Sequence, residues 1–332
     1  KVAPKVALAL AGGGPEGAIY EIGALRALEE VLEGIDLNDL DVYVGVSAGA
    51  FIGANLANGL TPAQMCRAIV KHEPGEHPFV PSTFLTPALG EFVKRGLDLP
   101  EIAFWALRNY LRRPGDRTLL ESLTRLARAL PVGLFANEPI RSYLSKIYSI
   151  KGRTDDFRQL KRKLIVVAAD LESGKAVRFG EPGLDHVPIS SAVQASTALP
   201  GLYPPVRIDG RNYVDGVLLK TLHASVALEA GATLVLCINP LVPVDTLRSV
   251  DPESLPDGGL LEHGLPSVLS QTFRTLIHSR LEIGLAAYAE RFRGSDVVLF
   301  EPAPDDYRMF FTNIFSFSAR RSVAHHAYQT TR

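Results

Sequence analysis

The sequence predicts an α/β fold in which a mostly parallel sheet lies between helices. Three features predict it: short apolar runs of strand length, amphipathic helices between them, and glycine-rich turns at the junctions. The apolar runs are continuous rather than alternating, as expected of strands that are buried on both faces. The predicted strands are Val6–Leu10, Val42–Val46, Leu164–Ala169, Leu234–Asn239 and Val297–Phe300.

Two helices are predicted near the start of the chain. The first runs from about Gly17 to Glu33, because its leucine and isoleucine residues recur at spacings of three and four, and Gly34 can end it. The second is a helix of small residues from Ala50 to Ala57. Strand, glycine turn and helix therefore occur twice in the first part of the chain, which is typical of an α/β protein.

Composition excludes several classes of protein. The 332 residues are enough for a sizeable core, and we interpret residues 1–332 as a single domain. The chain has 35 Lys and Arg against 36 Asp and Glu, so no overall charge attracts nucleic acid or an anionic membrane. Cys66 and Cys237 lack the spacing of a disulfide framework or a cysteine metal site. We therefore expect no metal, no cofactor and no nucleic-acid partner.

The sequence shows no membrane-spanning segment, because no stretch reaches the roughly 18–20 apolar residues that such a helix needs. The first residues, Lys1–Lys5, lead directly into a predicted strand and lack the apolar stretch of a signal peptide, which leaves an export signal upstream open. We expect a cytoplasmic protein, with peripheral contact to a membrane as one option.

Two segments depart from the α/β pattern. Residues 73–134 contain many prolines and amphipathic pieces such as Glu101–Arg113, and we interpret them as a helical insertion or cap. This insertion is either a helical layer packed on the sheet or a lid that meets lipid. From about residue 262 we expect a C-terminal helical extension, with a helix at Leu276–Arg293 and a last strand at Asp296–Pro302. An apolar run at 310–317 is open to three roles: core, contact with another copy in a homo-oligomer, or membrane contact.

The strongest chemical signal is the GxSxG motif from Gly45 to Gly49, which places Ser47 between a predicted strand and a predicted helix. This is the setting of a nucleophile elbow, a sharp turn that exposes a serine hydroxyl at the end of a strand. Glycines on either side of the serine are needed because a side chain there would clash with the neighbouring strand and helix. Ser47 is therefore the candidate nucleophile.

A second signal is the glycine loop that follows the first strand, Gly12, Gly13 and Gly14, with Gly17 a little further on. The spacing matches a dinucleotide-binding GxGxxG fingerprint. It also suits an oxyanion loop, whose backbone N–H groups face a serine on the next strand. We prefer the oxyanion interpretation, because a pyrophosphate would lie beside the negative charge of Glu16. A bound nucleotide is not expected.

A nucleophilic serine needs a base, and Asp215 is the best candidate. Asp209-Gly210 predicts a hairpin whose second strand delivers Asp215 to its end, beside the flexible Gly216. Asp170 is a rival at the end of another strand, although a turn is its more common role. Eight histidines allow an ordinary Ser–His–Asp triad, but none stands in a comparable context. An Asp has an ordinary pKa of about 3.9, so an apolar site would be needed to raise it.

Taken together, these residues resemble the patatin-like phospholipases. Three blocks in the same order carry the resemblance: Leu8–Glu30, Gly45–Gly49 and Ala192–Asn239. The last block contains a proline-bearing approach to Asp215-Gly216, which is similar to the family's DG[GA] motif. The resemblance covers the core, whereas 73–134 and the C-terminal part match no motif.

The resemblance implies a three-layer α/β/α fold and a Ser–Asp dyad without a catalytic histidine or a metal. Carried over by position, Ser47 is the nucleophile and Asp215 the base, and the amides of Gly12, Gly13 and Gly14 form the oxyanion hole. The implied substrates are acyl esters of lipids, cleaved through an acyl-serine intermediate.

The glycine loop differs from the family pattern, which usually has an arginine where this chain has Glu16, and Pro15 lacks an N–H group. The sequence thus predicts a lipid acyl hydrolase that works at or near a membrane surface. Two alternatives stay open: a soluble carboxylesterase or thioesterase, and a catalytically weak or silent protein that binds lipid.

Overall fold

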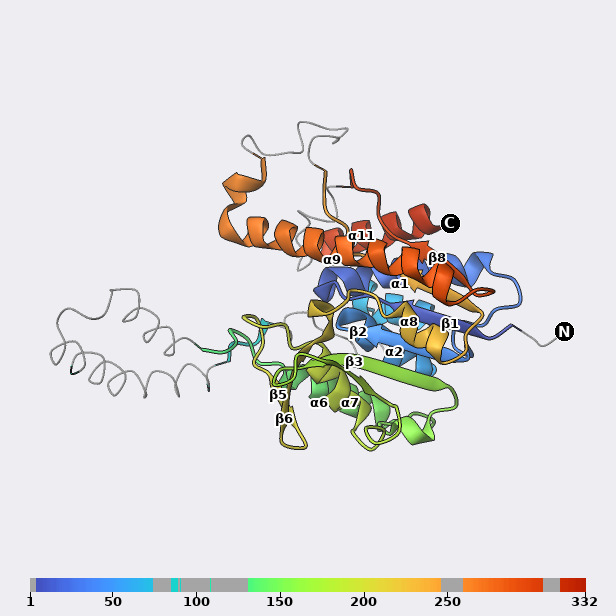
Figure 1. Cartoon of the computed structure of the whole chain (residues 1–332), viewed down its shortest axis with the longest axis horizontal. Helices are drawn as coiled ribbons and strands as arrows, with labels where there is room; N and C mark the ends of the chain where they lie inside the picture. The colour runs from blue at the N-terminus through green and yellow to red at the C-terminus, as the bar shows by residue number, and fades with distance from the viewer. Residues whose placement is uncertain are drawn as a thin grey trace.

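The computed structural model describes residues 4–73, 85–88, 90, 108, 131–245, 259–306 and 317–332. The predicted insertion at 73–134 lies almost wholly outside the described residues, and so does most of the apolar run at 310–317. Within the described part, an eight-stranded sheet is covered by helices on both faces (Figure 1). This is the α/β architecture that the sequence predicts.

The five strands predicted from apolar runs are confirmed, and they form the parallel part of the sheet. The strand order is β5-β6-β3-β2-β1-β7-β8, and β4 also pairs with β3. The parallel strands are β1 (Val6–Leu10), β2 (Val42–Val46), β3 (Lys163–Asp170), β7 (Leu234–Ile238) and β8 (Asp296–Phe300). Three short strands are antiparallel to their neighbours: β4 (Ala176–Phe179), β5 (Val206–Ile208) and β6 (Arg211–Asp215). The predicted Asp209-Gly210 turn joins β5 to β6.

Continuous apolar runs arise here because successive residues of one strand enter two different cores. In β1, Leu8 and Leu10 face one core, whereas Ala7 and Ala9 face the other. Both faces of the strand are dry, so neither set of positions needs polar side chains.

In the described part of the chain, more helices cover one face of the sheet than the other. The first core lies under α1 (Gly14–Val31), α2 (Ala48–Ala57), α6 (Glu138–Tyr148), α7 (Ile189–Ser196) and α11 (Phe317–Thr331). The short α3 (Pro62–Met65) and a π-helical turn at Cys66–Lys71 extend this layer. The second core lies under α8 (Ala224–Glu229) and α9 (Gly264–Arg291). Single 3-10 turns occur at Phe157–Gln159, Gly216–Leu218 and Gly259–His263. Helix α1 begins earlier than predicted, because Pro15 fits the first turn of a helix.

The C-terminal part is joined closely to the rest of the domain. Strand β8 extends the parallel sheet beyond β7, so the segment from about 262 supplies a strand as well as helices. Helix α11 lies directly on α1, where a methyl group at Gly23 would come within 2.2 Å of the Ala324 carbonyl oxygen. Within the described ranges, none of the helices has both the length and the apolarity to cross a bilayer.

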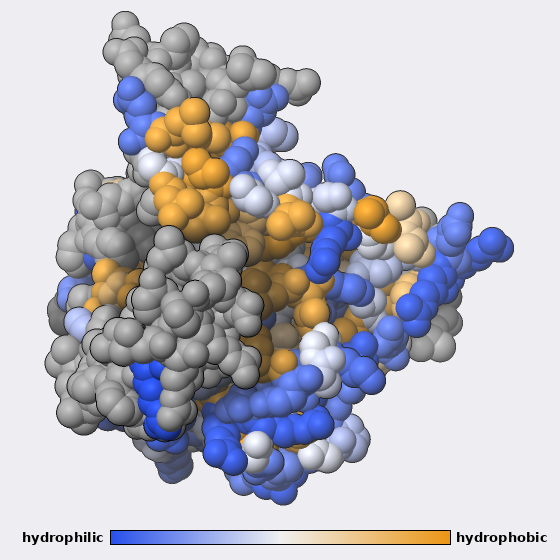
Figure 2. Space-filling model, turned by 60° about the vertical axis from the view of Figure 1, so that its left-hand side comes forward, coloured by the Kyte–Doolittle hydropathy of each residue, from blue (hydrophilic) through white to orange (hydrophobic). Residues whose placement is uncertain are grey.

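Apolar side chains also reach the surface. Figure 2 shows hydrophobic residues gathered on the face that the left-hand end of Figure 1 presents, where α9 begins. The exposed residues on α9 are Leu265, Val268, Leu269, Phe273, Leu276 and Ile283.

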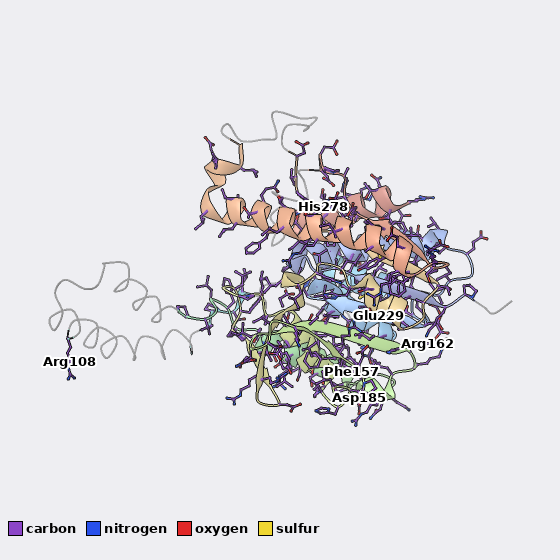
Figure 3. The ribbon with its side chains drawn as sticks, viewed as in Figure 1. Arg108, Phe157, Arg162, Asp185, Glu229 and His278 are labelled. Atoms are coloured by element: carbon purple, nitrogen blue, oxygen red, sulfur yellow. The ribbon has the colours of Figure 1, made fainter. Side chains whose placement is uncertain are left out.

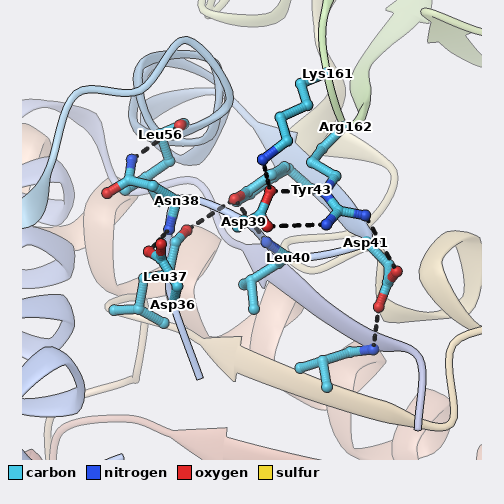
Figure 4. Close-up of polar contacts among 11 residues, drawn as sticks. Asp36, Leu37, Asn38, Asp39, Leu40, Asp41, Tyr43, Leu56, Lys161 and Arg162 are labelled. Atoms are coloured by element: carbon cyan, nitrogen blue, oxygen red, sulfur yellow. Dashed lines mark hydrogen bonds and ion pairs between the residues drawn. The ribbon is translucent and has the colours of Figure 1, made fainter. Parts of the chain in front are cut away.

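Charged side chains join the strands at the end of the sheet that lies opposite Ser47. The Asp39 carboxylate accepts hydrogen bonds from Arg162 at 2.8 and 2.9 Å and pairs with Lys161 at 2.7 Å, and both cations hold its pKa below the ordinary value (Figure 4). Asp41 accepts a hydrogen bond from the Val6 amide at 2.8 Å. Arg162 and Glu229 lie toward this end of the molecule (Figure 3). These contacts hold the amino ends of the central strands, away from Ser47.

Candidate active site

Ser47 occupies a sharp turn between β2 and α2. Its φ of 54° and ψ of −123° lie in a region that residues other than glycine rarely adopt. The flanking glycines are required by space: a methyl group at Gly45 would lie 2.4 Å from the Gly49 carbonyl oxygen, and one at Gly49 would lie 2.4 Å from the Leu10 carbonyl oxygen. The GxSxG motif thus forms a sharp strand-to-helix turn with the geometry that a nucleophile elbow requires.

Ser196 anchors this elbow from the end of α7. Its hydroxyl accepts a hydrogen bond from the Ser47 amide at 2.8 Å and donates one to the Val167 carbonyl at 2.6 Å. The bridge ties the turn to β3, and Ser196 is fully buried. Ser196 was not among the predicted site residues. Its position in the block that approaches Asp215 is the feature of the sequence that could have pointed to it.

Asp215 lies at the end of β6, where it pairs with Ala168 of β3. One carboxylate oxygen, Oδ2, accepts a hydrogen bond from the Ser47 hydroxyl at 2.6 Å, and Oδ1 accepts one from the Val217 amide at 2.9 Å. The side chain is 1% exposed. Burial raises the pKa of Asp215 to about 7, against the opposing effect of these two hydrogen bonds. The two residues predicted as nucleophile and base are therefore in direct contact.

The rival Asp170 is engaged elsewhere. Its Oδ2 accepts a hydrogen bond from Arg211 at 2.7 Å, and its Oδ1 accepts the amides of Glu172 and Ser173 in a tight turn. Burial by itself raises the pKa of Asp170, but the hydrogen bonds from these amides and the Arg211 guanidinium hold it below the ordinary value. Asp170 is thus a turn residue with a stable negative charge.

No histidine among the described residues is hydrogen-bonded to Ser47 or Asp215. The nearest in sequence to the pair, His223, is buried at the start of α8. Burial, together with Lys220, lowers its pKa to about 4, so this imidazole is neutral at physiological pH. The contact between serine and carboxylate is direct.

The glycine loop lies against the elbow. A methyl group at Gly12 would be 3.1 Å from the Ser47 Cβ atom. The Gly12 amide donates to the Thr221 carbonyl at 3.2 Å, whereas no carbonyl among the described residues accepts from the amides of Gly13 or Gly14. Within the described part of the chain, two of the three predicted oxyanion amides thus have no hydrogen-bond acceptor. Both stand at the start of α1, where the helix dipole favours negative charge.

A carboxyl group and a guanidinium group lie close together beside this loop. Glu16, in the first turn of α1, has its Oε2 3.9 Å from a guanidinium nitrogen of Arg274 on α9. Burial raises the pKa of Glu16 to about 8, although the charge of Arg274 acts in the opposite direction. Arg274 also donates to the Val242 carbonyl at 3.2 Å. Glu16 thus faces the cation Arg274, which belongs to a helix far away in the sequence. The sequence alone did not indicate this contact.

Fold and site together define an α/β protein with a serine at a sharp strand-to-helix turn, a carboxyl group in contact with it and a glycine loop beside it. The family model for patatin-like phospholipase matches residues 8–228 of the chain. The protein belongs to the patatin-like phospholipase family.

Curated relatives align with about two thirds of this chain. An uncharacterised NTE family protein of Mycobacterium bovis is 28% identical over 236 residues, which cover 71% of this chain and 49% of that protein. A protein of Invertebrate iridescent virus 6, named a probable lipid hydrolase, is 22% identical over 228 residues, 67% of this chain and 63% of its own. The crystal structure of VipD from Legionella pneumophila aligns with 99% of this chain and 66% of VipD, at 15% identity and a TM-score of 0.44. The chain spans about half the length of the mycobacterial relatives.

Proposed function

We propose that this protein is a serine acyl hydrolase that cleaves acyl esters of lipids, with Ser47 as nucleophile and Asp215 as base. The observation that carries the proposal is the 2.6 Å hydrogen bond from the Ser47 hydroxyl to Asp215, formed between two buried side chains. Membership of a phospholipase family supports lipid esters as the substrate class.

In the first half-reaction, the Ser47 oxygen attacks the ester carbonyl carbon while its proton passes to Asp215. The carbonyl oxygen gains negative charge, which the free amides of Gly13 and Gly14 can stabilise at the start of α1. Asp215 then gives the proton to the departing alcohol, and an acyl-Ser47 ester remains.

In the second half-reaction, Asp215 takes a proton from water, which attacks the acyl-serine. The same carboxyl returns the proton to Ser47 as the fatty acid leaves. A base works best when its pKa lies near the working pH, and the pKa of Asp215 at about 7 meets this condition. An Asp at its ordinary pKa would hold the proton too weakly.

The test is hydrolysis of nitrophenyl esters from butyrate to palmitate by wild type, Ser47→Ala and Asp215→Asn. Asp170→Asn is the matched control, because Asp170 is equally buried on the neighbouring strand. We expect both dyad variants to lose at least about 10³-fold in kcat/KM and the control to lose less than about tenfold. A fluorophosphonate should label Ser47 in wild type. Wild-type turnover by Ser47→Ala would refute the proposed mechanism.

The acyl-chain optimum separates two kinds of esterase. Preference for long chains agrees with a lipid acyl hydrolase, whereas a butyrate optimum indicates a soluble carboxylesterase or thioesterase.

A second candidate function follows from the glycine loop. Glu16 places a carboxyl beside the oxyanion amides, and ionisation of this group would oppose an oxyanion. A silent protein of this fold would bind lipid without turnover, and its binding would be unchanged in Ser47→Ala. Detectable wild-type hydrolysis that depends on Ser47 excludes this candidate.

A further inference from the structure

The first half of α9 exposes a row of apolar side chains. Leu265, Leu269, Phe273 and Leu276 are separated by four, four and three positions, which places them on one face of the helix. Their exposed fractions are 68%, 45%, 49% and 58%. We call these four residues the α9 stripe.

The helix segment that carries the stripe contains little charge. Between Gly264 and Ile277 the sequence contains one charged residue, Arg274, and that side chain is buried on the opposite side of α9 with Glu16. A contiguous apolar patch without charges marks a surface that another apolar surface covers. Ile283 differs: it is 70% exposed, but it directly follows Glu282 and lies three positions after Arg280, on a charged part of the helix. The stripe is therefore distinct from single exposed apolar residues.

The opposite side of the same helix segment contacts the surroundings of the active site. The Gln271 side chain bonds both the amide and the carbonyl of Val244, at 3.1 and 2.7 Å. Arg274 reaches Val242 and Glu16, which belongs to the oxyanion loop. The stripe and the contact with Glu16 thus lie on opposite sides of one helix, which is about 10 Å thick.

Further apolar residues are exposed at the same end of the molecule. Val132, Leu134 and Leu202 are each more than 40% exposed, and backbone hydrogen bonds join the two segments that carry them. Figure 1 shows these segments and the start of α9 on the left-hand side, toward which β1 runs. Figure 2, with that side turned forward, shows the hydrophobic surface over α9. Apolar groups thus lie on two separate elements beside the carboxyl ends of the strands.

We propose that the α9 stripe docks on the surface of a lipid bilayer and thereby places a lipid ester at the oxyanion loop. The proposal rests on the proposed function, since it assumes a lipid substrate. A bilayer fits the observations because it is broad enough to contact two separated elements at one end. Because the stripe is uncharged, binding should not need anionic lipid or low salt.

The first test measures co-sedimentation with phosphatidylcholine vesicles in a Ser47→Ala background, at low and high salt. The stripe variant replaces Leu265, Leu269 and Leu276 by serine, and Ile283→Ser is the matched control. We expect the stripe variant to bind at least about 100-fold more weakly, since three leucines no longer leave water on binding. The control should bind as the parent does. Circular dichroism checks that both variants are folded.

The second test adds a reporter and does not depend on loss of binding. In a Trp105→Phe background, which removes the single tryptophan of the sequence, Leu269→Trp or Ile283→Trp is introduced. On addition of vesicles, emission from Leu269→Trp should shift to the blue and be quenched by brominated lipid, whereas Ile283→Trp should not respond.

Equal binding by the stripe variant and its parent would overturn the proposal, as would equal quenching of both tryptophans. A stripe-dependent dimer in sedimentation velocity without vesicle binding would overturn it in favour of a second copy. Because binding is measured without Ser47, failure of ester hydrolysis does not affect this result. The two proposals can therefore fail separately.

Discussion

Replacing Asp215 by asparagine should make the folded chain more stable at neutral and alkaline pH while it removes catalysis. The substitution keeps the shape of the side chain, and the amide oxygen can still accept from Val217. The new amide can donate to the Ser47 oxygen in place of accepting from it. The variant loses the negative charge of Asp215 in its buried site and thereby also loses the base.

The magnitude follows from the pKa of Asp215, which lies at about 7 in the folded chain against an ordinary 3.8. One pKa unit corresponds to about 1.4 kcal/mol, so ionised Asp215 destabilises the folded state by about 4 kcal/mol. Because the folded pKa is raised, the penalty is absent below pH 4 and grows until pH 7. About 3 kcal/mol of it develops between pH 5 and pH 8.

The assay is urea denaturation followed by circular dichroism at pH 5 to 8. The free energy of unfolding of Asp215→Asn minus that of wild type should rise by about 3 kcal/mol over this range. Other titrating groups cancel in this difference, because both proteins contain them. Asp170→Asn is the control, and its effect on the free energy of unfolding should have the opposite sign. This variant loses the ion pair with Arg211, so it should be less stable than wild type by an amount that is constant across these pH values.

A flat difference between Asp215→Asn and wild type would refute the reasoning, because it would show that Asp215 titrates as it does in the unfolded chain. Hydrolysis should fall by at least about 10³-fold in the same variant. Full activity with asparagine would mean that another group is the base.

Three further results are expected. Ser196→Ala removes the anchor of the Ser47 amide, so denaturation should show a loss of about 1–3 kcal/mol and kinetics a fall in kcat with little change in KM. Gly49→Ala places a methyl group 2.4 Å from the Leu10 carbonyl oxygen and should cost about 3 kcal/mol or more in thermal denaturation. Since the pKa of Glu16 is about 8, wild-type kcat should fall above pH 8, and Glu16→Gln should remove that fall.

Each of these has a result that contradicts it. Unchanged kcat in Ser196→Ala would show that the elbow does not need its anchor. Gly59→Ala is the control for Gly49→Ala, because open space surrounds Gly59 and only its positive φ opposes a side chain; equal destabilisation would count against the clash. An alkaline fall that persists in Glu16→Gln would assign it to another group.

Local features of the fold were predictable. The five parallel strands are recognisable because burial on both faces demands uninterrupted apolar residues. The elbow at Ser47 is recognisable because a tight turn between strand and helix needs glycine at fixed positions. Strand β4 was not predicted, since it has four residues, only Phe179 of them buried, and no periodic pattern.

The sequence by itself determined the fold class, the candidate nucleophile and, through a hairpin signal and a resemblance, the candidate base. Tertiary structure alone decided which groups meet. The contact of Ser47 with Asp215 spans 168 positions and depends on the register of β6 against β3. The Gly12–Thr221 bond and the Glu16–Arg274 pair likewise join distant elements. Hydrogen bonds and pKa shifts depend on neighbours in space and on exclusion of water, which residue spacing does not encode.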